Sequence, residues 1–561
     1  MATITQVIQR LLPYGTREPS PEMPHLVDWS TPPSWPTDLF AVAATLVELA
    51  GCYAHSTLPG AKTSWHKRAR RFGRTWSELD AGDAVAVAAL TKRLTKLWGE
   101  LLRAGHAAAA CRMDADLPAW CLAAMELMAI ADEAAAGIGF DNSSGLAQTA
   151  RGWHWDGPLG ASSASPEERR RRTATLCVLV PPEECCVQPK ARTPQVGCNL
   201  RSLSLHLALL PPIGHVTTRH LISPAPLAHT KLNVLLVPYP YRIASDVFGE
   251  SMAVPSEKWG RFTLRQSWLP ESWPKRLAAF ISELCGAAEA AGTPIHGVVL
   301  PELALASDGL DAFASKLVGS CKLDFLIAGA LSTGKAGVRN IAKCFLFADG
   351  NVLTSWEQAK HHRWRLDEAQ LKAYGLALRG RTVGVEWWWE GIDVANREVT
   401  FHMIHEDGGL LAAFICEDLA RVDPVQPVVR AVGPNLLVAL LMDGPQAIRR
   451  WPGRYANGLC EDPGTSVLTV SCAATVERWL DSRGLADAPL VAVWKDMWTG
   501  TDPRELALPR DHHALVLSLD LDQVEERTLD RRADEGQALA VKFCDVRPIR
   551  HPNPPNWVDR P

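Results

Sequence analysis

Three reactive residues each follow an apolar stretch, and this pattern constrains the fold of the chain more than any other feature. Glu302 ends the run Val-Val-Leu-Pro-Glu (298–302), and Cys416 ends Leu-Leu-Ala-Ala-Phe-Ile-Cys (410–416). Lys360 follows a third run of the same kind. Apolar and β-branched runs that stop at a polar residue are typical of buried strands. A rigid sheet would therefore hold all three reactive groups at its strand ends.

These three residue types form a coherent set for nucleophilic catalysis. A thiol attacks as its thiolate, so it needs a base to take its proton and a cation to favour the negative charge. Glu302 can be that base and can later return the proton to a leaving amine. Lys360 can stabilise the thiolate and the oxyanion of a tetrahedral intermediate. The backbone N–H of Glu417 is a second candidate donor to that oxyanion and so a substrate-binding group.

The order of short motifs adds a family resemblance. Pro-Glu-Leu, then Lys-x-His, then Cys-Glu-Asp resembles the nitrilase (carbon–nitrogen hydrolase) superfamily over roughly residues 230–525. The resemblance implies an αββα four-layer sandwich and cleavage of a non-peptide C–N bond through a cysteine thioester. That family carries a second glutamate in the loop after the lysine, and Glu368 matches it. Asp443, in Met-Asp-Gly, follows the next apolar run, where the family lines its acyl pocket.

Strands and helices alternate from Leu232 onward. Strands are expected at 232–238, 298–303, 325–331, 341–348, 351–356, 410–416, 435–442, 465–472, 490–494 and 514–519, and helices at 273–291, 308–320 and 425–431. The alternation allows either a two-sheet sandwich or an open doubly wound sheet. The resemblance favours the sandwich for residues 229–526. The Pro-rich segment 527–561 is expected to be a surface tail.

Residues 1–228 predict a mainly helical domain with a connecting segment. Apolar faces at helical spacing occur at 39–50, 90–101 and 117–136, and Cys177-Val-Leu-Val180 predicts a strand. No acid–base cluster is found in this part. It is therefore expected to regulate the enzyme or bind a protein partner. Similar two-part nitrilase-like proteins occur beside reverse transcriptases in phage-defence loci, a resemblance that extends only to the layout.

Composition excludes several classes of protein. With 58 basic and 62 acidic residues and a net charge of −4, the chain has no global charge that favours nucleic acid, although a local patch is compatible with these values. Fourteen cysteines stand at irregular spacings, without a Cys-x-x-Cys pair or a zinc-like set. We therefore expect free thiols, no metal, no cofactor and a cytoplasmic location. No apolar stretch is long enough to span a membrane.

The segment after Lys360 predicts the substrate. His361, His362, Arg363 and Trp364 follow it directly, and the tryptophans at 387–389 come soon after. Cations beside the reactive groups favour an anionic, nucleotide-like amide, and tryptophan can stack on a planar base. The alternative is that these residues only pack or form contacts in a homo-oligomer, which is also the expected state of the enzyme.

Two other functions stay open. An amine in place of water would make the same thioester chemistry an acyl transfer. The hydrolase fold could also be retained as a scaffold for a binding or regulatory partner. In the connecting segment, Lys190, Arg192 and Arg201 are candidates for phosphate binding.

Overall fold

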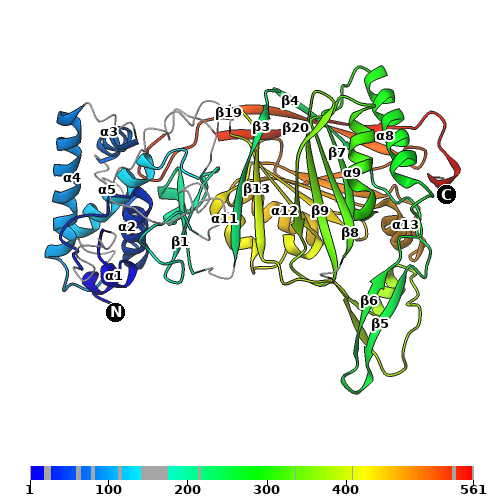
Figure 1. Ribbon diagram of the computed structural model, residues 1–561, viewed down its shortest axis with the longest axis horizontal. Helices are drawn as coiled ribbons and strands as arrows, with labels where there is room; N and C mark the ends of the chain where they lie inside the picture. Colours follow the sequence, from blue (N-terminus) through cyan, green and yellow to red (C-terminus); the bar gives the residue numbers. More distant parts are fainter. Residues whose placement is uncertain are drawn as a thin grey trace.

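The computed structural model separates a helical part at one end of the chain from a sheet-rich body at the other (Figure 1). It describes residues 2–17, 27–57, 65–77, 83–111, 116–139, 175–212, 216–334, 337–406, 408–533 and 538–558.

The first large sheet contains seven strands in the order β10-β9-β8-β7-β4-β19-β20. Their bounds are β4 Lys231–Leu236, β7 Gly297–Ala306, β8 Phe325–Gly334, β9 Gly337–Ala348, β10 Asn351–Ala359, β19 Ala514–Val524 and β20 Ala538–Ile549. Strands β4, β7 and β8 run parallel, and the outer strands pair antiparallel. Glu302 lies on β7 of this sheet, and Lys360 directly follows β10.

The second large sheet has the order β18-β17-β16-β15-β14-β13-β3. Its strands are β3 Thr217–Leu227, β13 Glu398–His405, β14 Leu410–Ile415, β15 Leu436–Leu441, β16 Ser466–Ser471, β17 Leu490–Lys495 and β18 Arg504–Ala507. Strands β14, β15 and β16 are parallel neighbours. Cys416 follows β14 directly.

Helices cover the outer face of each sheet, so the body has four layers (Figure 1). Helices α8 (Trp273–Ala290) and α9 (Leu310–Val318) pack on the first sheet. Helices α11 (Val425–Val432) and α12 (Trp451–Glu461) pack on the second, and α13 (Ala473–Asp481) follows β16. The αββα sandwich predicted for this part is confirmed, and the open doubly wound sheet is excluded.

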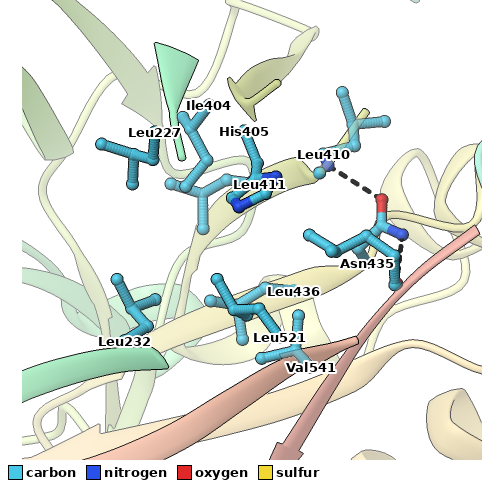
Figure 2. Close-up of a pocket in the computed structure, with 12 residues that line it drawn as sticks. Leu227, Leu232, Ile404, His405, Leu410, Leu411, Asn435, Leu436, Leu521 and Val541 are labelled. Carbon is cyan, nitrogen blue, oxygen red and sulfur yellow. Dashed lines mark hydrogen bonds between the residues drawn. The ribbon is translucent and has the colours of Figure 1, made fainter. Parts of the chain in front are cut away.

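The central strands are apolar on both faces because each has a sheet on one side and helices on the other. All six residues of β14 and all six of β15 are buried. Near one end of the inter-sheet core a void of about 20 Å³ remains, lined mainly by leucines (Figure 2). Beside it Asn435 accepts the N–H of Leu410 at 2.8 Å and donates to the carbonyl of Leu539 at 2.6 Å, which ties the two sheets together.

A small sheet projects from the sandwich (Figure 1). Its order is β11-β12-β6-β5, with bounds β5 Phe248–Val254, β6 Trp259–Leu264, β11 Arg365–Asp367 and β12 Trp387–Glu390. The short helix α10 (Glu368–Ala373) follows β11. The sequence did not predict this sheet.

The N-terminal part is mainly helical, as predicted. Its helices are α1 Ile4–Leu11, α2 Pro36–Ala50, α3 Trp65–Ser77, α4 Ala84–Arg103 and α5 Ala119–Ala134, and a two-stranded ribbon joins β1 (Cys186–Pro189) to β2 (Leu207–Leu210). The strand predicted at 177–180 is wrong. There the backbone N–H groups of Val178, Leu179 and Val180 all donate to Asp38, at 2.9–3.1 Å, so this side chain replaces a neighbouring strand as the acceptor.

Two predicted boundaries differ from the structure. Strand β3 lies inside the predicted helical segment but pairs with β13 in the second sheet. Residues 527–561 are not a surface tail, because β20 pairs with β19 along its whole length. The turn between them reaches the helical part, where Arg532 is fully buried and donates to Asp132 and Glu133, both at 3.0 Å.

The candidate phosphate ligands of the connecting segment serve the structure instead. The Lys190 ammonium donates to the carbonyl of Ser204 at 2.5 Å. The guanidinium of Arg192 pairs with Glu526 at 2.6 Å, and that of Arg201 pairs with Asp462 at 2.5 Å. Among the described residues, no helix is both long and apolar enough to cross a membrane.

Candidate active site

Glu302 lies in an irregular part of β7, at the edge where the two large sheets and the small sheet meet. The pairing of β7 with β8 shifts between Leu300 and Leu305, and Leu303 has a positive φ of 56°. Opposite this bulge is Gly329, where a β-carbon would come within 2.5 Å of the Glu302 Cα. A bulge re-aims side chains from the regular alternation of a strand. Here Glu302 is directed into the buried site, with 2% of its surface exposed.

Lys360 lies between two buried carboxylates. Its Nζ donates to Glu302 Oε1 at 2.8 Å and to Glu390 Oε2 at 2.7 Å. Asn340, on β9, donates its amide to the same two carboxylates at 2.8 and 2.9 Å. The second oxygen of Glu302 accepts the backbone N–H of Met442 at 2.8 Å. This network fixes the lysine and both acids in one arrangement.

The electrostatics of this cluster keep the lysine charged. Burial disfavours the ammonium, but Glu302 and Glu390 outweigh it and hold the pKa of Lys360 well above its usual value. Burial raises the pKa of Glu302, and the positive charge of Lys360 opposes the rise. A carboxylate with a raised pKa is a stronger base than an ordinary glutamate.

Cys416 follows β14 and begins a short 3₁₀ turn, Cys416–Leu419. Its φ of 45° lies in the left-handed region, which costs a non-glycine residue about 1–3 kcal/mol and occurs often at functional sites. Burial and then the negative charge of Glu302 raise the pKa of the Cys416 thiol, while Lys360 lowers it. The resting group is therefore a thiol, and its activation requires proton transfer to a base. Lys360 binds Glu302 directly, and the N–H of the next residue donates to Asp418, two residues after Cys416, so the predicted set of Glu302, Lys360 and Cys416 is brought together.

The fourth predicted catalytic residue is not part of this cluster. Glu368 is exposed at the start of α10 and pairs with Arg381 at 2.5 Å. Glu390, at the end of β12, lies beside Lys360 instead. The sequence could have indicated Glu390, because this residue follows the apolar run Trp387-Trp388-Trp389 as Glu302 follows its own apolar run.

Three predicted substrate contacts lie on the far side of the Lys360 backbone. The backbone N–H groups of His361 and His362 donate to the buried Asp418, at 2.9 and 3.1 Å. The His361 ring contacts the carbonyl of Glu398 at 3.0 Å, and Arg363 donates to the carbonyl of Ile392 at 2.8 Å. These side chains line a separate surface groove with Trp387 and Trp389. They do not join the cluster around Lys360.

Trp364, another predicted substrate contact, lies beside the cluster around Lys360. The Trp364 backbone donates to Glu390 at 3.1 Å, and its ring packs edge-on against Phe248 and Phe262 in an apolar cluster that also contains Met442. That cluster lies beside Glu302.

Asp443 has protein partners for its carboxylate. It accepts hydrogen bonds from Tyr374, from Arg450 at 3.0 Å and from the Trp451 indole at 3.1 Å. It therefore shapes the wall of the site. The carboxylate of Glu417 pairs with Arg421. Among the described residues, no group of three or more His, Cys, Asp or Glu is placed to hold a metal ion.

Comparison with known proteins gives only distant structural matches. No protein-family model and no curated protein matches the sequence. Saccharomyces cerevisiae Nit3, a member of branch 10 of the nitrilase superfamily, is 12% identical over 56% of this chain and 88% of its own, with a TM-score of 0.27. XC1258 from Xanthomonas campestris, a CN-hydrolase superfamily protein, is 14% identical over 44% of this chain and 77% of its own, at 0.24. C. elegans NitFhit is 13% identical over 44% of this chain and 52% of its own, with a TM-score of 0.25. At identities this low, the likeness concerns the fold alone.

Proposed function

We propose that this protein is a thiol enzyme that hydrolyses a non-peptide C–N bond of an amide-type substrate through a thioester on Cys416. The observation that carries the proposal is the buried pairing of Lys360 with two carboxylates beside a strained cysteine. Burying one cation and two acids is costly unless they are paired and hydrogen-bonded. Such an arrangement is typical of an active site, where perturbed pKa values cluster.

The first half-reaction forms the thioester. Glu302 accepts the thiol proton while the Cys416 sulfur attacks the carbonyl carbon and forms the C–S bond. Lys360 stabilises the oxyanion, and the backbone N–H of Glu417 is the candidate second donor. Glu302 then gives the proton to the amide nitrogen, the C–N bond breaks and the amine leaves.

The second half-reaction releases the acid. Glu302 removes a proton from water, the water oxygen attacks the thioester carbon, and the C–S bond breaks. The proton returns to the Cys416 sulfur, so the enzyme ends in its starting state. Glu390 does not exchange a proton in this scheme. It positions Lys360 and adds negative charge that keeps the lysine protonated.

The apolar cluster beside Glu302, in which the buried Phe248 and Phe262 pack against Trp364, favours a small substrate with an apolar acyl group. The anionic substrate expected from His361, His362 and Arg363 loses its support, because those side chains lie in the surface groove.

Turnover tests the proposal. The full-length protein is incubated with a library of small amides, and release of ammonia or amine is measured. Wild type should turn over at least one member, and Cys416→Ala should not. Adding a free amine to the active reaction shows whether water or the amine takes the acyl group. Equal turnover by wild type and Cys416→Ala would rule out the thioester mechanism.

A further inference from the structure

A surface groove lies on the outer side of β12, opposite the face that carries Glu390. Its volume is about 840 Å³, within the range of roughly 300–1,000 Å³ that is usual for small-molecule sites. The described residues that line it are arginine, histidine or tryptophan, apart from Val394, and none of them is acidic. The net charge of the whole chain gives no hint of this local concentration of cations.

The floor of the groove is one face of the small sheet. Strand β12 pairs in parallel with β6, so that Trp387 lies beside Trp259, and Trp389 lies beside Arg261. Alternate residues of a strand point to opposite faces. Trp388 and Glu390 accordingly point inward and are buried, whereas Trp389 is 37% exposed. The core therefore uses only the middle tryptophan of the three.

A second set of cations forms the wall of the groove. Arg363 donates to the carbonyl of Ile392 at 2.8 Å, while its buried Nε has no hydrogen-bond partner among the described residues. Arg397 donates weakly to the carbonyl of His361, at 3.5 Å. Both bonds are to backbone carbonyls, which do not neutralise the positive charge of a guanidinium.

The cations also stand close enough to repel each other. Burial and then the positive charge of Arg261 lower the pKa of Arg363, which Asp393 and Glu390 oppose. Burial lowers the pKa of His362, a hydrogen bond to the Asp423 backbone and the charge of Asp423 oppose this, and the positive charges of Arg397 and Arg421 lower it further.

Some carboxylates lie at the rim of the groove. Glu417 pairs with Arg421, and Glu257 accepts from the Trp259 indole at 2.6 Å. Asp367 is 3.7 Å from Arg365, which lies next to Trp389 on the same face. These three acids have other partners than Arg261, Arg363 and Arg397. Asp393 and Glu390 offset part of the positive charge of Arg363.

We propose that this groove binds a ligand of nucleotide chemistry, whose planar base stacks on Trp387 or Trp389 and whose phosphate pairs with the arginines. The guanidinium fork matches phosphate oxygens in a bidentate way. Tryptophan stacks on any base because every base has a π-face. A small carboxylate would leave the indoles unused, and an apolar partner would leave the cations unpaired. A free nucleotide and single-stranded nucleic acid both present this chemistry.

Two probes separate these sources in binding experiments on the full-length protein. One is a fluorescein-labelled oligothymidylate of about ten nucleotides, within the site sizes of single-strand binders, measured by anisotropy. The other is AMP, measured by calorimetry. We expect at least one probe to bind, with an affinity that falls as salt rises. Binding of the oligomer alone identifies a strand site, and equal binding of AMP identifies a site for one nucleotide.

Matched variants locate the binding. Trp389→Ala should weaken it about 5- to 150-fold, the usual range for loss of one stacked base, whereas Trp389→Phe should retain most of it. Arg261→Ala should weaken binding and reduce its salt dependence. Arg483→Ala, which removes an exposed arginine stacked on Trp479 outside the groove, should change neither.

Three results would overturn the proposal. One is failure of both probes to bind wild type, and another is equal weakening by Arg261→Ala and Arg483→Ala. The third is a groove whose variants change only self-association in sedimentation, since it would then be a contact between copies of this chain. None of these results depends on turnover at Cys416.

Discussion

At the scale of single residues, the two carboxylates around Lys360 have different duties. Glu390→Gln should keep the shape of the site but lose one charge-assisted hydrogen bond to the lysine. Such bonds contribute about 1.5–3 kcal/mol, so turnover should fall roughly 10- to 150-fold. Glu368→Gln is the matched control, because Glu368 is exposed and pairs with Arg381. Equal losses of turnover in the two variants would show that Glu390 has no specific role in the active site.

The pH dependence of Cys416 reactivity follows from the raised pKa of Glu302, whose usual value is 4.5. Below the raised pKa Glu302 is protonated and cannot accept the thiol proton. Labelling of Cys416 by iodoacetamide, followed by peptide mass mapping, should therefore rise with pH through an inflection above 4.5. In Glu302→Gln this inflection should vanish. An inflection that persists in the variant would mean that another group is the base.

Glu302 and Cys416 could be predicted because each directly follows a long apolar run, and Lys360 because it stands between them in the motif order. Glu390 follows a run too, but its partner lies 30 residues earlier in the chain and only the folded small sheet brings them together. The sequence also could not predict the direction in which the side chains of His361 and Arg363 point. Asp418 binds the backbone after Lys360 and turns those side chains away from the cluster.

At the scale of elements, the bulge in β7 depends on the absence of a side chain in β8. A β-carbon on Gly329 would come within 2.3 Å of the Pro301 carbonyl oxygen, so Gly329→Ala must displace the backbone that carries Glu302. We expect loss of turnover and destabilisation of about 1–3 kcal/mol, as is usual for overpacking. Gly334→Ala, on the same strand with open space around it, should be neutral. Urea unfolding and the amide assay measure both effects, and an active, stable Gly329→Ala would contradict this role of the bulge.

The long central strands and their helices matched the sequence prediction because their apolar runs are unbroken. The small sheet did not. Strands β6 and β12 alternate buried residues with exposed ones, and they pair across more than a hundred residues of chain. β20 was missed for a similar reason, because only four of its twelve residues are buried.

At the scale of the whole molecule, the turn after β19 joins the sandwich to the helical part. Arg532 is buried between Asp132, Glu133 and Asp530. Arg532→Ala leaves these acids without their cation, and breaking a buried pair of this kind typically costs about 3–5 kcal/mol. Arg527→Ala, which removes an exposed partner of Glu525, should cost about 0–1 kcal/mol. Denaturant unfolding compares the two, and equal midpoints would show that the parts are not joined through Arg532.

The same contacts explain why the domain boundaries could not be predicted from sequence. The pairing of Arg532 with Asp132 spans 400 residues. Strand β3 lies before the predicted boundary and completes the second sheet. A chain of residues 229–561 would lose both and should not fold alone.

The most direct test of the central claim is the intact mass of the protein during reaction with an amide that it turns over. The proposed mechanism predicts that the reacting protein gains the mass of the acyl group, that peptide mapping places the gain on Cys416, and that hydroxylamine removes it. Cys416→Ala should show no gain. An acyl group on any other residue, or turnover without a covalent intermediate when release is slowed by low temperature, would contradict the thioester mechanism.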